Sequence, residues 1–408
     1  MGLEDKAAAE RVHISFFGRR NAGKSSIVNA VTGQEMSIVS DVAGTTTDPV
    51  RKTMEILPLG PVVIIDTPGL DDEGTLGEKR VEKMREALAR TDIAVIVLDG
   101  DSASEDLKAL SEELFKRGIP YIVLLNKCDL ISDIRSPEDF PESIKSVFPK
   151  AEKFQCASAR TGQGIEELKN SLAVHTLKAK KEKPIVSDLL KAGDMIILVI
   201  PIDESAPKGR IILPQQSVLR EALDSHCAVT CCQPEELGGV LDKLSISPRL
   251  VVTDSQAISE VAAIVPPDIA LTTFSILFAR YKGNLETLSE GAKRLMELKE
   301  GGRVLLSEGC THHRQCNDIG TVKLPGLIQK HLGISLNFSF SSGMGFPADA
   351  ELSGYDLIIH CGGCMLNEKE MQDRMRRAKE AGVPMVNYGM VFAVLNGTLK
   401  RCLAPFGK

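Results

Sequence analysis

The chain has 408 residues, of which 43% are hydrophobic and 25% charged, so we expect a globular protein of two or three domains. No run of about 18 apolar residues occurs, which argues against a membrane span, and the formal net charge of −6 argues against a nucleic-acid partner. Because no secretory apolar segment follows Met1, we expect a cytoplasmic protein whose ten cysteines serve as metal ligands or buried thiols and not as disulfides.

Strand-like and helix-like segments alternate over residues 11–174, as they do in an α/β domain with a mostly parallel sheet. The β-rich run 11–17 leads into Gly18-Arg-Arg-Asn21-Ala22-Gly23-Lys24-Ser25-Ser26, where a helix is expected to begin near Lys24. The pattern Gly-x4-Gly-Lys-Ser between a strand and a helix predicts a phosphate-binding loop, because its backbone N–H groups and the helix N-terminus favour anions. In such a loop Lys24 reaches the β- and γ-phosphates, and the Ser25 hydroxyl binds Mg²⁺.

Two further segments are suited to magnesium and the γ-phosphate. A second apolar strand ends in Asp66-Thr-Pro-Gly69, where the Asp66 carboxylate can hold Mg²⁺ through water and the Gly69 N–H can sense the γ-phosphate. Upstream, a polar loop that contains Thr45 and Thr46 is expected to become ordered around the metal and the phosphate. Both segments belong to the machinery that hydrolyses a nucleoside triphosphate.

A third apolar strand predicts the identity of the base. The run Tyr121–Asp129 ends in Asn126-Lys127-Cys128-Asp129. The Asp129 carboxylate can accept from both the N1–H and the 2-amino group of guanine, and adenine offers neither in that arrangement. A buried acceptor left without its donor costs about 1–3 kcal/mol, so such a site favours guanine. Ser158 and Ala159 supply the last loop expected to contact the base.

Together these motifs resemble the Ras-like P-loop GTPases of the translation-factor-related class, in the bacterial branch that contains MnmE and Era. The resemblance implies that residues 1–176 bind GTP or GDP with Mg²⁺, and that Thr46 is the magnesium-binding switch residue. Leu70 stands where Ras-type enzymes carry the water-positioning glutamine, so a low intrinsic turnover is expected. In this branch a potassium ion held by the P-loop asparagine compensates, which matches Asn21 and predicts hydrolysis stimulated by K⁺. The catalytic residues that the resemblance implies are Lys24, Thr46, Asp66 and Gly69.

A lysine-rich segment, residues 175–184, reads as a helix end followed by a solvated linker. Residues 184–270 then alternate strands and helices again, with expected strands at 195–200, 228–231 and 250–253 and an expected helix at 215–224. No catalytic signature occurs here, so by elimination we expect a smaller α/β domain for dimerisation. We interpret its cysteines as buried free thiols, because adjacent cysteines on a strand point to opposite faces. They are Cys227, Cys231 and Cys232.

The last region, residues 271–408, is expected to form a third, also smaller α/β domain. A helix is expected over Phe274–Leu298, with strands at 303–306, 355–359 and 383–386. These strands lead into Ser307-Glu308-Gly309-Cys310, His360-Cys361-Gly-Gly-Cys364 and Asn387-Tyr388-Gly389. In open α/β sheets the loops after the carboxyl ends of the strands build the binding crevice, so Cys310, Cys361 and Cys364 converge if the strands are parallel.

The cysteines of this region predict a metal site. Two glycines separate Cys361 from Cys364 and let the backbone fold back, so that both sulfurs can point at one ion or cluster. With Cys310 they give three thiolates, which together with one exchangeable ligand suit iron–sulfur chemistry; a zinc site or a chance pair is the competing interpretation. The fourth ligand is left open, and a histidine can also act by hydrogen bonds beside the metal. The candidates are His312, His313, His360, Glu308, Cys316 and an exogenous ligand.

The whole arrangement resembles the HydF family, the GTPase scaffold proteins of FeFe-hydrogenase maturation. The resemblance rests on the pattern Cys310-x-His312-x47-His360-Cys361-x-x-Cys364 downstream of a GTPase domain. It implies a 4Fe–4S cluster on the three cysteines, with His312 or His360 as the fourth ligand or close to it. It also implies a homodimer that works with the radical-SAM maturases HydE and HydG, carries a transient di-iron precursor and delivers it to apo FeFe-hydrogenase. GTP hydrolysis then serves as a conformational switch.

Two other functions compete with this interpretation. A ribosome- or tRNA-associated GTPase with a structural zinc domain shares the first half, but it needs a basic RNA-binding module that this acidic chain does not offer. A metal-binding scaffold with a vestigial GTPase domain is the second, and the intact nucleotide motifs argue against it. EPR and metal analysis after anaerobic reconstitution with iron and sulfide distinguish the iron–sulfur interpretation from the zinc interpretation.

Overall fold

The computed structural model describes residues 11–33, 50–67, 69, 75–100, 104–131, 139–179, 183–202, 211–309, 319–343 and 345–407. The chain divides into two compact units, each with a hydrophobic core of its own. We call residues 10–182 the N-terminal unit and residues 183–408 the C-terminal unit. The division falls between residues 182 and 183, within the lysine-rich segment 175–184 that was predicted to end in a linker.

The described part of the N-terminal unit contains a six-stranded sheet in the order β2-β3-β1-β4-β5-β6. Only β2 is antiparallel to its described neighbour, and the other neighbouring pairs are parallel. The strands are β1 (Val12–Gly18), β2 (Val50–Ile56), β3 (Gly60–Asp66), β4 (Ile93–Leu98), β5 (Tyr121–Leu125) and β6 (Lys153–Cys156). The helices are α2 (Lys24–Thr32), α3 (Thr75–Arg90), α4 (Glu105–Lys116), α5 (Glu142–Val147) and α6 (Ile165–Ala179), with a 3₁₀ turn η1 (Cys128–Leu130).

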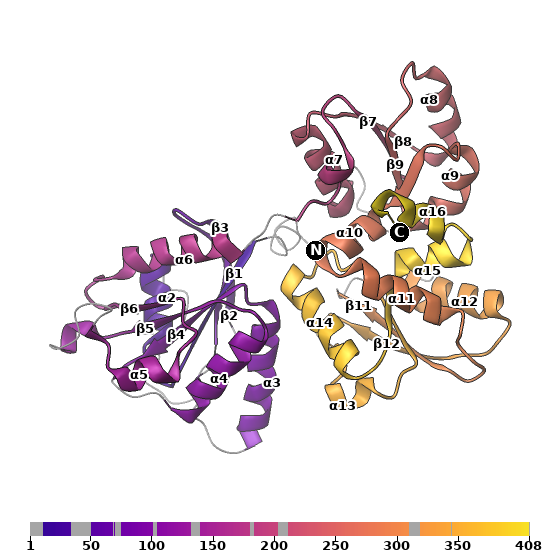
Figure 1. The fold of residues 1–408 in the computed structure, drawn as a ribbon. Helices are drawn as coiled ribbons and strands as arrows, with labels where there is room; N and C mark the ends of the chain where they lie inside the picture. Colours follow the sequence, from indigo (N-terminus) through magenta and orange to yellow (C-terminus); the bar gives the residue numbers. More distant parts are fainter. Residues whose placement is uncertain are drawn as a thin grey trace. The chain divides into compact units, whose positions relative to one another are not determined.

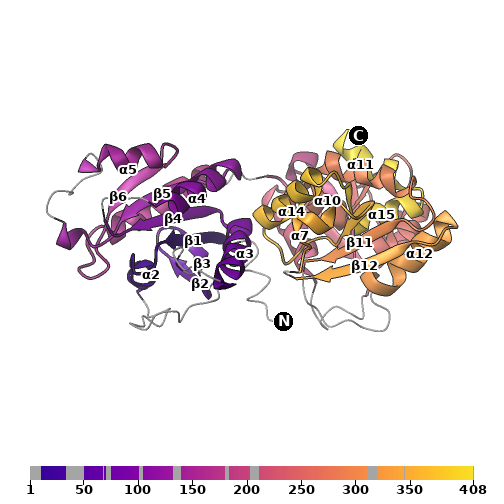
Figure 2. The same ribbon diagram turned by 90° about the horizontal axis from the view of Figure 1, so that it is seen from below.

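Continuous apolar runs make the central strands of this sheet, because helices cover both of its faces. Ile14 and Phe16 of β1 pack with Ile27 of α2 and Leu168 of α6 on one face. Figures 1 and 2 show α3, α4 and α5 on the opposite face. The predicted Ras-like α/β fold of this unit is confirmed.

Two four-stranded sheets, both fully parallel, form the described part of the C-terminal unit, in the orders β10-β9-β7-β8 and β12-β11-β13-β14. The first sheet contains β7 (Met195–Val199), β8 (Ala228–Cys232), β9 (Leu250–Thr253) and β10 (Ala270–Thr273). The second contains β11 (Arg303–Glu308), β12 (Asn337–Ser342), β13 (Leu357–His360) and β14 (Met385–Asn387). The helices are α7 (Leu213–Asp224), α8 (Leu237–Lys243), α9 (Ile258–Ile264), α10 (Phe274–Lys282), α11 (Leu285–Leu295), α12 (Leu324–Leu332), α13 (Asp349–Leu352), α14 (Glu368–Glu380), α15 (Tyr388–Leu395) and α16 (Leu399–Leu403).

The two sheets of the C-terminal unit share one hydrophobic core. Buried residues of the first sheet, such as Val251, belong to the same cluster as Leu305 and Ile358 of the second. Helices α10, α15 and α16 lie between the sheets (Figure 1). The predicted domain boundary between residues 270 and 271 stays a prediction, and the strand β10 crosses it.

Three predictions for the C-terminal unit need correction. The expected helix over Phe274–Leu298 is two helices, because Asn284 caps α11 by accepting from the Thr287 N–H at 3.0 Å, and a Cβ on Gly283 would lie 2.8 Å from the Ala279 carbonyl oxygen. Strand β12 has no counterpart in the prediction, since this serine-rich edge strand lacks an apolar run. Cys231 is exposed and not buried, because β8 also lies at a sheet edge. None of the described helices is long and apolar enough to cross a membrane.

Candidate functional site

The phosphate-binding loop joins the end of β1 to the start of α2. Asn21 and Gly23 have positive φ angles of 60° and 86°, which wrap the backbone around the loop. Lys24 is buried, and its Nζ donates to the carbonyl oxygens of Gly18 at 3.0 Å and Arg19 at 2.8 Å. The ammonium group thus lies inside the loop, in the position that the motif predicts for contacting phosphates.

Two side chains expected at the magnesium ion lie together beside this loop. The Ser25 hydroxyl donates to Asp66 Oδ2 at 2.7 Å, and Asp66 is 1% exposed at the end of β3. Gly69 approaches the loop so closely that a Cβ there would lie 2.9 Å from the Arg20 Cα, which only glycine permits. The other predicted ligands of this site, Thr45 and Thr46, lie outside the described residues.

The Asn126 side chain ties the base-binding loops to the phosphate loop. Its Nδ2 donates to the Ala22 carbonyl oxygen at 3.0 Å, and its Oδ1 accepts from the Ala159 N–H at 3.2 Å. Lys127 has a φ of 60° and donates through Nζ to the Asn21 carbonyl oxygen at 3.0 Å. Side chains of one motif therefore hold together three loops that are far apart in the sequence.

The remaining predicted base contacts follow the same arrangement. Asp129 is exposed within the turn η1, so its carboxylate can be reached by a base. Ser158 is buried, and its Oγ accepts from the Thr161 N–H at 3.2 Å, which shapes the last loop. Ser26 lies in the first turn of α2, next to the phosphate loop.

The cysteine loop, residues 361–366, follows the carboxyl end of β13. Strands β11 and β13 are parallel, with Ser307 paired to His360, so the segments that follow them lie side by side. The Gly309 N–H donates to Cys361 Sγ at 3.1 Å, and the Gly363 N–H donates to the same sulfur at 3.4 Å. The predicted convergence of the strand ends is therefore present in the described residues.

The electrostatics of Cys361 show what a metal would have to supply. Burial raises the pKa of its thiol to about 11, and the negative charges of Cys364 and Glu308 act in the same direction, against the N–H groups of Gly309 and Gly363. A metal that binds here must displace a proton, and in return it stabilises the thiolate. Two N–H donors on one sulfur suit a thiolate ligand, so the residues present fit an iron–sulfur or other thiolate-bound metal.

The structure describes only part of the expected ligand set. Within the described residues no group of three histidine, cysteine, aspartate or glutamate side chains is arranged to hold a metal ion. Four of the residues named as ligands or candidates lie outside them. They are Cys310, His312, His313 and Cys316.

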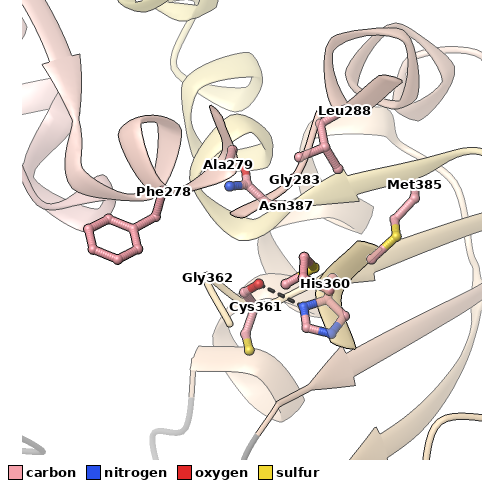
Figure 3. Close-up of a pocket in the computed structure, with 10 residues that line it drawn as sticks. Phe278, Ala279, Gly283, Leu288, His360, Cys361, Gly362, Met385 and Asn387 are labelled. Carbon is pink, nitrogen blue, oxygen red and sulfur yellow. Dashed lines mark hydrogen bonds between the residues drawn. The ribbon is translucent and has the colours of Figure 1, made fainter. Parts of the chain in front are cut away.

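His360 is fully engaged by hydrogen bonds on both ring nitrogens. Its Nδ1 lies 2.8 Å from the Cys361 carbonyl oxygen, which can only accept, and its Nε2 lies 3.0 Å from Arg374 Nη1, which can only donate. The imidazole therefore carries its proton on Nδ1. Burial, together with the charge of Arg374, lowers the pKa of His360 to about 3, so the ring stays neutral. Figure 3 shows the Nδ1 contact.

Behind His360, the buried guanidinium of Arg374 holds several strand ends together. It donates to Glu370 Oε1 at 3.3 Å, to the Gly343 carbonyl oxygen at 2.6 Å and to Ser307 Oγ at 3.4 Å. Both members of the Arg374–Glu370 pair are less than a tenth exposed. The sequence does not indicate this buried pair, because an Arg and a Glu four residues apart in a strongly charged helix usually lie on the surface.

Glu308 is the one candidate fourth ligand besides His360 that the structure describes. It is 5% exposed, and its Oε1 accepts from the Tyr388 hydroxyl at 3.4 Å. A cavity of about 10 Å³ beside Cys361 and His360 has room for roughly one water, so it is not a substrate pocket (Figure 3).

Comparison with known families assigns the C-terminal unit. The model "Hydrogen maturase F dimerization domain" matches residues 185–283, and "Hydrogen maturase F tetramerization domain" matches residues 286–405. The model "50S ribosome-binding GTPase" matches residues 13–127. The chain belongs to the hydrogen maturase F family. The resemblance inferred from the nucleotide and cysteine motifs is confirmed.

Curated relatives match the GTPase domain of this hydrogen maturase F family member. The tRNA modification GTPase MnmE of Coxiella burnetii is 32% identical over 167 residues, 40% of this chain and 34% of the relative. GTPase Der of Wolinella succinogenes is 37% identical over 178 residues, 41% of this chain and 37% of the relative. The chain thus spans about a third of the length of these relatives. A solved structure of a variant of Era from Aquifex aeolicus, bound to GDP and AlF4⁻, is 20% identical, covers 54% of this chain and 91% of that chain, and has a TM-score of 0.36.

Proposed function

We propose that this protein is a GTP-hydrolysing scaffold that binds a 4Fe–4S cluster through Cys310, Cys361 and Cys364. In this role it assembles or carries a di-iron precursor, together with the radical-SAM maturases HydE and HydG, and delivers it to apo FeFe-hydrogenase. One observation carries the proposal: Cys361, held by two N–H donors, lies beside the strand end that leads to Cys310, in a unit that two hydrogen maturase F models match.

The N-terminal unit supplies the hydrolysis of GTP in this proposal. Lys24 binds the phosphates, Ser25 binds Mg²⁺ directly, and Asp66 holds it through water. Gly69 senses the γ-phosphate through its N–H. Asn21 contributes to a potassium site that offsets the missing glutamine, since a cation at the phosphates neutralises the charge that develops during hydrolysis.

The C-terminal unit holds the cluster. Three thiolates leave one position of a 4Fe–4S cluster for a weaker, exchangeable ligand, which is the chemistry that a carrier needs. His360 acts in this proposal as a positioning residue, because an iron ligand at Nε2 would displace its hydrogen bond with Arg374. Glu308 stays a candidate for the fourth position, as do His312, His313, Cys316 and an exogenous ligand.

The oligomeric state is also part of the proposal. The two matched models are described as dimerization and tetramerization domains. We infer a homodimer through the region of the first model, which is able to pair further through the region of the second. Sedimentation of the full chain at several concentrations tests this inference, and a monomer at every concentration contradicts it.

Anaerobic reconstitution with iron and sulfide tests the cluster assignment. We expect about four iron and four sulfide per chain and, after reduction, the EPR signal of a 4Fe–4S cluster. Cys361→Ser and Cys364→Ser should each lose most of the iron. Cys231→Ser is the matched control, because Cys231 is an exposed thiol in the other sheet, and it should keep a full cluster. Stoichiometric zinc without an EPR signal would instead support the GTPase with a structural zinc domain.

A further inference from the structure

A buried lysine at the end of helix α10 donates hydrogen bonds to the cysteine loop. Lys282 is the last residue of α10, and it is 2% exposed. Its Nζ donates to the carbonyl oxygens of Gly363 at 3.2 Å, Cys364 at 3.3 Å and Leu366 at 2.8 Å. The Nζ also lies 5.6 Å from the centre of the Phe278 ring. Three acceptors of one turn therefore converge on one ammonium group.

The match between donor and acceptors explains how the charge can be buried. An ammonium group has three N–H donors and no acceptor, so three carbonyl oxygens satisfy it fully. A buried ion without hydrogen-bond partners is strongly unfavourable, and so is a buried carbonyl oxygen that has lost its donor. The loop carbonyls and the Lys282 ammonium group thus satisfy each other's hydrogen bonds.

The turn that Lys282 holds is the one that places the sulfurs. Gly363 has a φ of 63°, which favours glycine, and a Cβ there would lie 2.3 Å from Met371 Cε, so a larger residue would also have to displace the Met371 side chain. Its N–H donates to Cys361 Sγ, while its carbonyl oxygen accepts from Lys282. Gly363 therefore faces the sulfur on one side and the ammonium group on the other.

We propose that Lys282 is the positioning residue of the cysteine loop, and that its charge favours the reduced form of the bound cluster. The part of this inference that concerns the cluster rests on the proposed function. The part that concerns the geometry of the loop holds without bound iron. The contact joins the region of the dimerization model to the loop in the region of the tetramerization model.

The sign of the electrostatic effect follows from charge. A positive charge stabilises a nearby group that gains negative charge. It therefore stabilises the reduced cluster, which carries one more negative charge than the oxidised cluster. Removing the charge of Lys282 should move the reduction potential to a more negative value.

Three substitutions separate position from charge. Lys282→Met removes both the donors and the charge, Lys282→Gln keeps a donor without the charge, and Lys282→Arg keeps the charge. Lys293→Met on α11 is the matched control, because it removes the same charge from an exposed position.

The first measurement uses the metal-free protein, in which alkylation of Cys361 and Cys364 by iodoacetamide is followed by mass spectrometry. We expect a severalfold faster reaction in Lys282→Met and Lys282→Gln, because the loop opens more often, and near-wild-type rates in Lys282→Arg and Lys293→Met. Unchanged rates in both neutral variants overturn the positioning role. Loss of the folded C-terminal unit in both also overturns it, because the lysine would then support the whole unit and not this loop.

The second measurement is an EPR-monitored redox titration of the reconstituted variants. Lys282→Gln should lower the equilibrium constant for one-electron reduction about tenfold, or about 59 mV, while Lys282→Arg and Lys293→Met stay close to wild type. Equal potentials in wild type and Lys282→Gln overturn the electrostatic part. If the wild-type protein takes up no cluster, the proposed function fails, and the alkylation result still decides whether Lys282 positions the loop.

Discussion

Each unit of this protein has a buried lysine that donates to backbone carbonyl groups, and the two lysines differ in where those carbonyls come from. The acceptors of Lys24 lie five and six residues upstream, in its own loop. The acceptors of Lys282 lie 81 to 84 residues downstream, in a loop after another strand. A local motif can thus specify the first site, whereas the second exists only once the whole C-terminal unit has folded.

The difference extends to what holds each site in place. The nucleotide site consists of short motifs at the ends of parallel strands, joined by side chains such as Asn126 that belong to the motifs themselves. The cysteine loop depends on Lys282 and, through His360, on Arg374. Neither of these two residues belongs to the cysteine motif. We therefore expect the two sites to fail separately.

Lys24→Ala, in the N-terminal unit, should give the largest effect. Loss of the phosphate-binding ammonium group should reduce GTP hydrolysis about a thousandfold, to background. The iron content after reconstitution should stay at the wild-type level, because Lys282, Gly309 and Arg374, which hold the cysteine loop and His360, all belong to the C-terminal unit. Phosphate release and iron analysis on the same preparation test both statements. Lys116→Ala, at an exposed position of α4, is the control and should keep both properties. Loss of the cluster in Lys24→Ala would contradict the separation.

Local motifs explain why much of this architecture could be predicted. The glycine and lysine pattern between β1 and α2, and the apolar runs before Asp66 and Asn126, each specify a strand and the loop that follows it. Because parallel strands end at one edge of a sheet, the nearness of Gly309, after β11, to Cys361, after β13, could be expected without further information. Periodicity and turn chemistry act over a few residues, and these features need no more than that.

The missed features depend on contacts between distant segments. Strand β12 pairs with β11 at the sheet edge, and its alternation of Phe338 and Phe340 with polar residues contains no continuous apolar run of the kind that marked the other strands. The break at Gly283 is set partly by Met375, since a Cβ at Gly283 would lie 3.0 Å from its sulfur. Lys282 falls inside the helix expected over Phe274–Leu298, and nothing in the sequence near it indicates that its charge is buried. It is buried because the cysteine loop, 81 to 84 residues downstream, packs against it in the folded protein.

Arg374→Met tests the contacts between distant segments that support the cysteine site, and it should give the second largest effect. It removes the guanidinium that pairs with the buried Glu370, and breaking a buried pair from one side costs about 3 kcal/mol or more. Calorimetry of the full chain should show the transition of the C-terminal unit at a lower temperature and that of the N-terminal unit unchanged.

Arg376→Met provides the control for this prediction. Arg376 lies in the same helix and pairs with Asp373 and Glu380, but its side chain is 37% exposed. An exposed pair contributes about 0–1 kcal/mol, so little change is expected. Equal falls of the unfolding temperature of the C-terminal unit in the two variants would show that burial does not distinguish the two arginines.

The smallest expected effect concerns the proposed potassium site at Asn21 of the phosphate-binding loop. Asn21→Ala should lower the ratio of GTP hydrolysis rates in K⁺ and Na⁺ from severalfold toward one, because the side-chain oxygen that contributes to the cation site is lost. Alanine also strains the backbone at a φ of 60°. Asn21→Gly removes the same oxygen without that strain, so an equal fall of the ratio in both variants assigns the effect to the side chain. A wild-type protein with equal rates in the two salts would contradict the potassium site itself, and a normal ratio in Asn21→Gly would place the effect of Asn21→Ala in the backbone.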